Sequence, residues 1–105
     1  MAQFDVHPNP GRQRDNVPYV VTLQSARFDR APTRLVAALI RGSALAMEAH
    51  YLAPRFTVLG QEVVLDVFNI ATVPVARLGP PVAALSDEQS RAQLTRALDE
   101  FLTQA

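Results

Sequence analysis

Short runs of β-branched and aromatic residues, separated by proline, glycine and polar turn formers, constrain this chain more than any other feature of its sequence. Runs of this kind are typical of β-strands joined by turns. They predict antiparallel strands at residues 3–7, 17–24, 35–40, 55–59, 62–68 and 71–77. The clearest hairpin lies around Gly60, because glycine supplies the backbone conformation that a tight reversal needs. A mostly β fold follows from this pattern.

Several strands carry more specific expectations. Alternation in the first run places Phe4 and Val6 inward and His7 on the surface. Pro18 belongs at a strand start or edge, and Pro74 predicts an edge strand or a bulge, since proline removes a ladder donor. The apolar run at 35–40 fits a strand or a buried helix, and its length favours the strand. Residues 8–16 form an exposed loop, and the alanine-rich stretch at 43–49 suggests a helical turn.

The C-terminal segment predicts an amphipathic helix over residues 87–102. Ser86 and Gln89 have the spacing of a capping box, and acidic residues follow Ser86 in the first turn. Apolar side chains then recur on one face, at Leu94, Ala97, Leu98, Phe101 and Leu102. Strands followed by one helix predict an α+β, mostly β architecture such as a small barrel.

Composition narrows the class of protein further. The chain has 105 residues, 49% of them apolar, which suits a single domain over residues 1–105 with its own core. It has no cysteine, so disulfides, thiolate catalysis and cysteine-ligated zinc are excluded. Neither a secretory leader nor an apolar run long enough to span a membrane is apparent, so we expect a cytoplasmic protein without membrane contact.

The charged residues are balanced overall but not along the chain. The formal net charge is zero, which argues against phosphate-driven nucleic-acid binding. Residues 1–55 carry seven arginines against four acids, a charge of +3, and residues 56–105 carry the opposite −3. This division fits a domain with mixed faces, or an arginine-bearing loop that meets an acidic partner.

No catalytic constellation stands out. His7 and His50 lack neighbouring groups that would make either a base or a ligand. Glu62 and Asp66 fall on one strand face, where a solvated pair is a simpler interpretation than a metal site. We therefore expect no metal and no cofactor, and a protein that is not an enzyme but acts by binding through its surface.

The order of these elements and four local motifs resemble the CcdB family, the toxins of toxin–antitoxin pairs. The motifs are QFDV at 3–6, VTLQS at 21–25, NIATVPVARLG at 69–79 and VAALS at 82–86. The resemblance implies an SH3-like barrel of antiparallel strands with a C-terminal helix, assembled as a homodimer. Family members bind the A subunit of DNA gyrase, trap its cleaved DNA complex, and are neutralised by a CcdA-like antitoxin through a disordered segment.

The same resemblance implies two sets of contact residues. The gyrase-binding set comprises Phe28, Asp99, Phe101, Leu102, Thr103, Gln104 and Ala105, and Arg12 and Arg14 belong to the antitoxin-binding loop. The family's poisoning activity is associated with a terminal Trp-Gly-Ile, where this chain has Thr103, Gln104 and Ala105 and no tryptophan anywhere. An aromatic anchor typically dominates such a contact.

Three functions follow for comparison. The first is a gyrase-poisoning toxin, and the second is a homologue that no longer poisons and acts as an antitoxin-binding or regulatory module. The third, an SH3-like nucleic-acid binder, is disfavoured by the zero net charge and by the lack of clustered aromatic residues for stacking.

Overall fold

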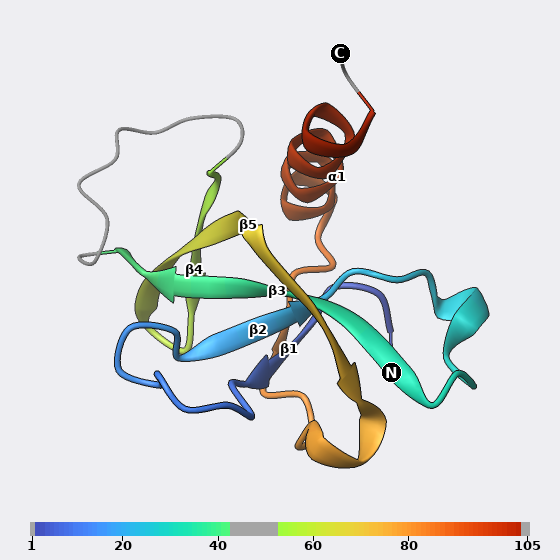
Figure 1. Ribbon diagram of the computed structural model, residues 1–105. Coiled ribbons are helices and arrows are strands. Elements are labelled where there is room, and N and C mark those ends of the chain that lie inside the picture. Colours follow the sequence, from blue (N-terminus) through green and yellow to red (C-terminus); the bar gives the residue numbers. More distant parts are fainter. Residues whose placement is uncertain (1, 43–52, 104–105) are drawn as a thin grey trace.

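A computed structural model of the protein describes residues 2–42 and 53–103. Within these two ranges, six strands form one antiparallel, barrel-like sheet that is nearly closed, and a long helix follows it (Figure 1). The strands are β1 (Asp5–Pro8), β2 (Tyr19–Thr22), β3 (Thr33–Arg41), β4 (Arg55–Val58), β5 (Gln61–Pro74) and β6 (Ala83–Ala84). The helices within the described residues are the 3₁₀-helices η1 (Ala26–Phe28) and η3 (Val75–Arg77) and the α-helix α1 (Glu88–Leu102). The mostly β fold with a C-terminal helix is therefore confirmed.

Strand β3 lies in the middle of the sheet, whose order is β4-β5-β3-β2-β1-β6. Residues 35–40 thus form a strand rather than a helix. Its neighbour β5 is 14 residues long and continuous, where the sequence predicted two strands, at 62–68 and 71–77. The pairing explains the difference, because β5 stays beside β3 throughout and the register shifts only once, between Ala37 and Ala38. Ala37 pairs with Ile70 and Ala38 pairs with Asp66, so β5 bulges between these two partners.

The two ends of β5 correct the expected strand boundaries. At its start, Leu59 and Gly60 both have positive φ, of 50° and 79°, and form the two-residue turn between Val58 and Gln61. The predicted hairpin is confirmed, with its turn one residue earlier than expected. At its end, β5 stops at Pro74, and residues 75–77 form η3 instead of strand. Residues 70–74 pair with β3 only, so Pro74 lies on an edge, as predicted.

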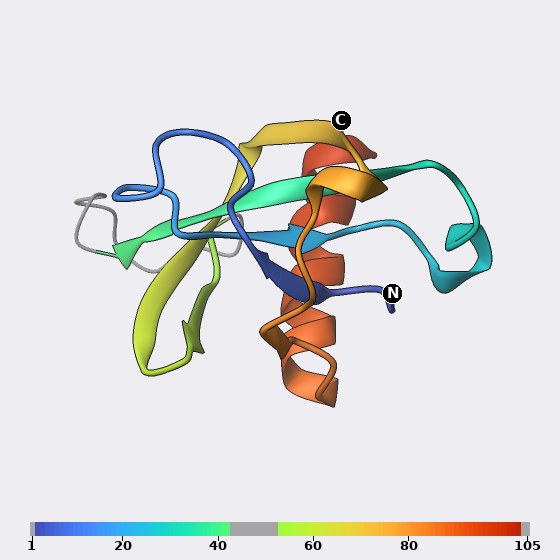
Figure 2. The same ribbon diagram turned by 90° about the horizontal axis from the view of Figure 1, so that it is seen from below.

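The main core lies between the sheet and α1. Figures 1 and 2 show α1 crossing the strands on one face, while the loop before β2 and η3 lie on the opposite face. Phe4 and Val6 are buried in this core, as predicted, together with Leu94 and Ala97 from the helix. The second face of β3 is also buried, through Val36, Ala38 and Ile40. Because a central strand here is covered on both sides, its apolar run has no alternation.

His7 is fully buried, not on the surface as the alternation predicted. It pairs with Val20 on the sheet face away from α1, which the segment after η3 covers. Its Nδ1 lies 2.7 Å from the carbonyl oxygen of Gly79. A carbonyl oxygen only accepts, so Nδ1 carries the hydrogen. The prediction was wrong because alternation identifies one covered face and cannot show that a distant segment covers the other.

The cap of α1 also differs from the expected capping box. Asp87, not Ser86, is the N-cap residue, and its carboxylate accepts a hydrogen bond of 3.0 Å from the Ser90 amide. The helix itself begins at Glu88 and ends at Leu102, within a residue of the predicted range. The helical turn expected at 43–49, and His50 beside it, lie outside the described residues.

We expect Leu94→Ala to destabilise the protein more than any exposed substitution on α1. Leu94 has no exposed surface and joins the helix to the sheet, so its truncation should cost about 2–5 kcal/mol. Thr95→Ala, one residue along on the exposed side, is the matched control and should change stability by about 0.5 kcal/mol or less. Urea unfolding followed by circular dichroism measures both, and equal losses would contradict this packing.

The N-cap predicts a pH dependence of stability. Hydrogen bonds from the Ser90 side chain and amide hold the pKa of Asp87 below its usual value. Its contribution is therefore fully present above the unfolded pKa, near 3.8, and is lost as the pH falls through the lower folded value. Asp87→Ala should lower the melting temperature at pH 6, with a difference from wild type that disappears in strong acid. A difference that persists unchanged in strong acid would exclude the ionised cap as its cause.

Candidate interaction surfaces

Two aromatic rings meet at the C-terminal end of α1. Phe68, in the bulged part of β5, is 80% exposed, and its ring lies edge to face with Phe101, with centroids 5.1 Å apart at 86°. Leu102, next along the helix, is 65% exposed. We call Phe68, Phe101 and Leu102 the aromatic patch. Exposed aromatic side chains held by a neighbour are common anchors of protein interfaces.

The bulge explains why Phe68 points outward. Val67 and Ile70 both pack toward the main core, so the two residues between them have no place in it. The Phe68 amide donates a hydrogen bond of 3.0 Å to the Asp66 carboxylate instead of pairing in the ladder. The bulge therefore directs the Phe68 side chain out of the core, and its ring contacts Phe101 there.

The last turn of α1 is closed by its own side chains. The Thr103 hydroxyl lies 2.7 Å from the Asp99 carbonyl oxygen and 2.8 Å from its carboxylate. The Thr103 amide also donates to the Asp99 carbonyl, at 2.9 Å. Asp99 and Thr103 are exposed, but their polar groups bond to each other. Their observed role is therefore to close the C-terminal end of the helix.

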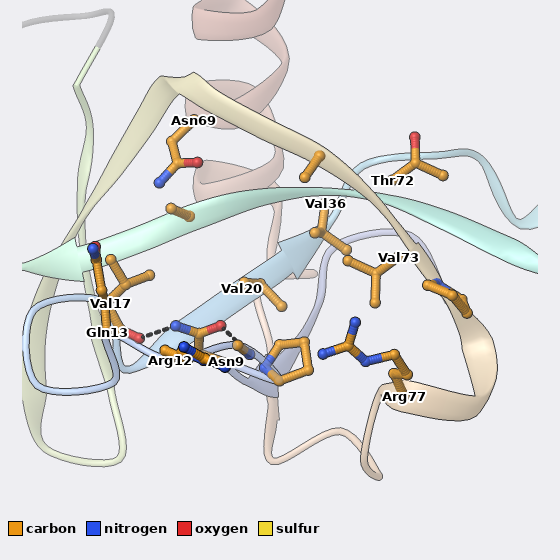
Figure 3. Close-up of a pocket in the computed structure, with 15 residues that line it drawn as sticks. Asn9, Arg12, Gln13, Val17, Val20, Val36, Asn69, Thr72, Val73 and Arg77 are labelled. Atoms are coloured by element: carbon orange, nitrogen blue, oxygen red, sulfur yellow. Dashed lines mark hydrogen bonds between the residues drawn. The ribbon is translucent and has the colours of Figure 1, made fainter.

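A groove of about 410 Å³ lies on the sheet face opposite α1 (Figure 3). Its floor is apolar and comes from β2 and β3, through Val20, Val36 and Ala38. One wall is the loop before β2 and the other is the last part of β5 with η3. The residues that complete the lining are Asn9, Pro10, Gly11, Arg12, Gln13, Val17, Asn69, Ala71, Thr72, Val73, Pro74 and Arg77.

Asn9 gives the loop wall its shape. Its side-chain amide donates to the Val17 carbonyl at 2.8 Å and accepts from the Gly11 amide at 2.9 Å (Figure 3). Hydrogen bonds of this kind, from an asparagine side chain to the backbone, stabilise one conformation of a turn. Arg12 then faces the groove, whereas the Arg14 guanidinium donates to the Gly11 carbonyl at 3.2 Å and does not line it.

Comparison with known proteins identifies the family. The family model described as CcdB protein matches residues 3–104, nearly the whole chain. The chain belongs to the CcdB family. No curated protein sequence matches it. CcdB proteins are toxins of toxin–antitoxin pairs rather than enzymes, so this chain is a toxin–antitoxin protein of the CcdB type.

The remaining residues expected in the CcdB contacts are not all brought together. Phe28, 61% exposed, lies in η1, which both views place away from the C-terminal end of α1 (Figures 1 and 2). Phe101 and Leu102 do lie together, and Thr103 follows them. Gln104 and Ala105 lie outside the described residues.

The acidic pair on β5 has other partners than a metal. Glu62 forms an ion pair of 2.7 Å with Arg55, and the Asp66 carboxylate accepts a hydrogen bond from the Phe68 amide. Among residues 2–42 and 53–103, no three potential ligands gather into a metal site. No helix in the same part of the chain is long and apolar enough to cross a membrane.

Sequence reasoning missed Phe68 and Arg77. For Phe68 a signal existed: alternation in 62–68 puts it on the same face as Glu62 and Asp66, and an aromatic residue beside two acids is a candidate contact. No pattern in the sequence indicated Arg77, because the groove that it lines is formed by segments that lie far apart in the chain.

The aromatic pair should be energetically coupled in the free protein. Phe68→Ala and Phe101→Ala, made singly and together, should give a coupling energy of about 0.5–1.5 kcal/mol in urea unfolding, as edge-to-face pairs do. Phe101→Ala alone should be the more costly change, since this side chain also packs against the main core. Additive losses would mean that the rings do not hold one another.

Proposed function

We propose that this CcdB-family protein is a toxin that binds the A subunit of DNA gyrase and traps its cleaved DNA complex, with the aromatic patch as the gyrase contact. The observation that carries the proposal is the exposed Phe68 ring held against Phe101 at the end of α1. The family places its poisoning residues at this end of the helix, and this chain keeps an aromatic surface there without the terminal tryptophan.

The patch supplies what such a contact requires. Hot spots are commonly large side chains that bury most of their surface and start in a fixed orientation. Phe68 is oriented by the bulge and by Phe101, so little conformational freedom is lost when a partner covers it. The mechanism is binding that stabilises one state of the target, and no chemical step on this chain is required.

The partners in this proposal are a second copy of the chain and a CcdA-like antitoxin. A homodimer would present two aromatic patches to a symmetric target. The loop with Arg12 and Arg14 would meet the disordered, acidic segment of the antitoxin, where opposite charge speeds association at low salt.

Gyrase from the host of this protein provides the test. Calorimetric titration into the gyrase A subunit and an assay for trapped cleaved DNA should both be positive for wild type. Phe68→Asn should weaken binding about thirtyfold, the scale of an interface hot spot of roughly 2 kcal/mol, and reduce trapping in parallel.

Leu59→Asn is the matched control. Leu59 is also exposed, at 68%, but lies at the tip of the β4–β5 hairpin, and asparagine tolerates its positive φ. This variant should bind and trap like wild type. Equal losses in both variants, or no wild-type binding at high micromolar concentration, would reject the aromatic patch as the gyrase contact.

A second function, an antitoxin-binding module that no longer poisons, is favoured by one observation. Thr103 stands at the position of the family tryptophan, and its hydroxyl turns back onto Asp99 rather than outward. Binding of the antitoxin without gyrase binding or trapping would support this second function over the first.

A further inference from the structure

We propose that Arg34 is a positioning residue that acts through Phe28. Its buried guanidinium holds the segment between β2 and β3 in one conformation, so that the Phe28 side chain is oriented before a partner binds it. That this partner is gyrase rests on the proposed function. The hold on the segment does not, because it is a property of the free protein.

The segment between β2 and β3 projects from the sheet and has no core of its own. We call residues 25–32, which include η1, the η1 segment, and none of these residues is buried. Figure 1 shows the segment standing beyond the ends of β2 and β3, clear of α1. The Phe28 side chain lies in it and is 61% exposed. Apolar burial therefore does not explain how this segment is held.

Arg34 binds the η1 segment through backbone carbonyl groups. It is the second residue of β3 and only 3% exposed. One terminal nitrogen donates to the carbonyl oxygens of Ala31 and Thr33, at 2.6 and 3.0 Å. The other terminal nitrogen donates to the carbonyl oxygen of Asp29. Because the guanidinium is planar and its donors have a fixed geometry, it sets the positions of these three carbonyls relative to one another.

Gln24 adds to this hold from the end of β2. Its side-chain nitrogen donates to the carbonyls of Phe28 and Thr33, at 3.2 and 3.4 Å, and its oxygen accepts from the Leu35 amide at 2.8 Å. The first amide of η3 donates to the Pro32 carbonyl at 2.9 Å. The carbonyls engaged in this way, by Arg34, Gln24 or η3, are those of Phe28, Asp29, Ala31, Pro32 and Thr33. The backbone of the segment is thus turned inward while its side chains remain exposed.

The charge of Arg34 is not used in an ion pair. In the described part of the chain, no carboxylate pairs with it. A buried cation without an acidic partner is costly unless other acceptors satisfy its donors, as the three carbonyls do here. A methionine could fill a similar space without that cost. What the guanidinium adds is the conformation of the η1 segment, and with it the direction of Phe28.

A partner that covers Phe28 would meet a segment that is already ordered. Ordering a loop during binding lowers affinity, so a segment held in advance binds more tightly. The resemblance to the CcdB family implies a gyrase contact for Phe28 but assigns no role to Arg34. In this inference Phe28 is a second anchor, separate from the aromatic patch, and Arg34 determines how well it is presented.

Calorimetric titration into the gyrase A subunit tests this role with Arg34→Met, Phe28→Ala and the double variant. Arg34→Met should weaken binding about fivefold, and Phe28→Ala about tenfold or more. In the Phe28→Ala background, Arg34→Met should have no further effect, because no ring remains to be oriented. The same fivefold loss in that background would mean a general effect on the fold and would overturn the proposal. Binding of Arg34→Met with wild-type affinity would overturn it as well.

Arg41→Met is the matched control. Arg41 lies at the other end of β3, and its guanidinium donates to the Asp15 carbonyl at 2.6 Å. The charge change is the same, but the η1 segment is not involved, so this variant should bind like wild type. Arg34→Lys keeps the charge without the planar donor geometry and should recover only part of the affinity. Equal weakening in Arg41→Met, or full recovery in Arg34→Lys, would assign the effect to charge and reject the positioning role.

Hydrogen exchange in the free protein tests the hold on the segment without any partner. The amides of Phe28, Asp29 and Ala31 donate to carbonyls within the η1 segment, at 3.0, 3.2 and 3.0 Å. Arg34→Met should speed their exchange at least tenfold and leave the exchange of the paired β3 and β5 amides unchanged. Unchanged exchange at all three amides would overturn the proposal.

Failure of this inference and failure of the proposed function give different results. If wild type does not bind gyrase, the gyrase function and the Phe28 contact are both rejected, while exchange still shows whether Arg34 holds the segment. If Phe68→Asn weakens gyrase binding but Phe28→Ala does not, the gyrase function stands and the role of Arg34 in binding is rejected.

Discussion

The pairing of β3 with β5 is the contact on which the rest of the structure depends. It runs the full length of β3 and is the longest pairing in the sheet. Alternate residues of β3 are buried on both sides, with Ala37 and Leu39 toward α1 and Val36 and Ala38 toward the groove. A strand covered on both faces is the most costly one to displace, so it fixes the position of everything that pairs with it or packs on it.

The single register shift in this pairing creates both interaction surfaces. If β5 followed β3 without a bulge, residues 67–69 would alternate in the ladder like the rest. The shift between Ala37 and Ala38 releases them, so Phe68 turns out against Phe101 while Asn69 lines the groove. Bulges commonly redirect side chains at functional positions. Here one bulge serves a surface on each side of the sheet.

Local patterns in the sequence were sufficient to predict most of the strands and the helix, but not the aromatic patch or the groove. The hairpin at Gly60, the inward Phe4 and Val6, and the helical face of Leu94 and Ala97 depend on neighbours in the chain, and all were predicted. Residues such as His7 and Arg77 depend on segments about 70 positions away, which periodicity does not detect. Asp87 replaced Ser86 as the cap because both residue types can cap, and only the backbone decides between them.

The placement of the two surfaces limits how one could influence the other. The aromatic patch includes the end of α1, whereas the groove lies on the opposite face of the sheet and is lined by neither Phe68 nor Phe101. Phe68 and Asn69 are nevertheless consecutive residues of the same bulge. The bulge is thus a direct link between the two surfaces, and any coupling through it would act equally in both directions by linkage. An occupant of the groove that changed the bulge would alter how Phe68 is held, and a partner bound to Phe68 would alter the groove wall to the same degree in free energy.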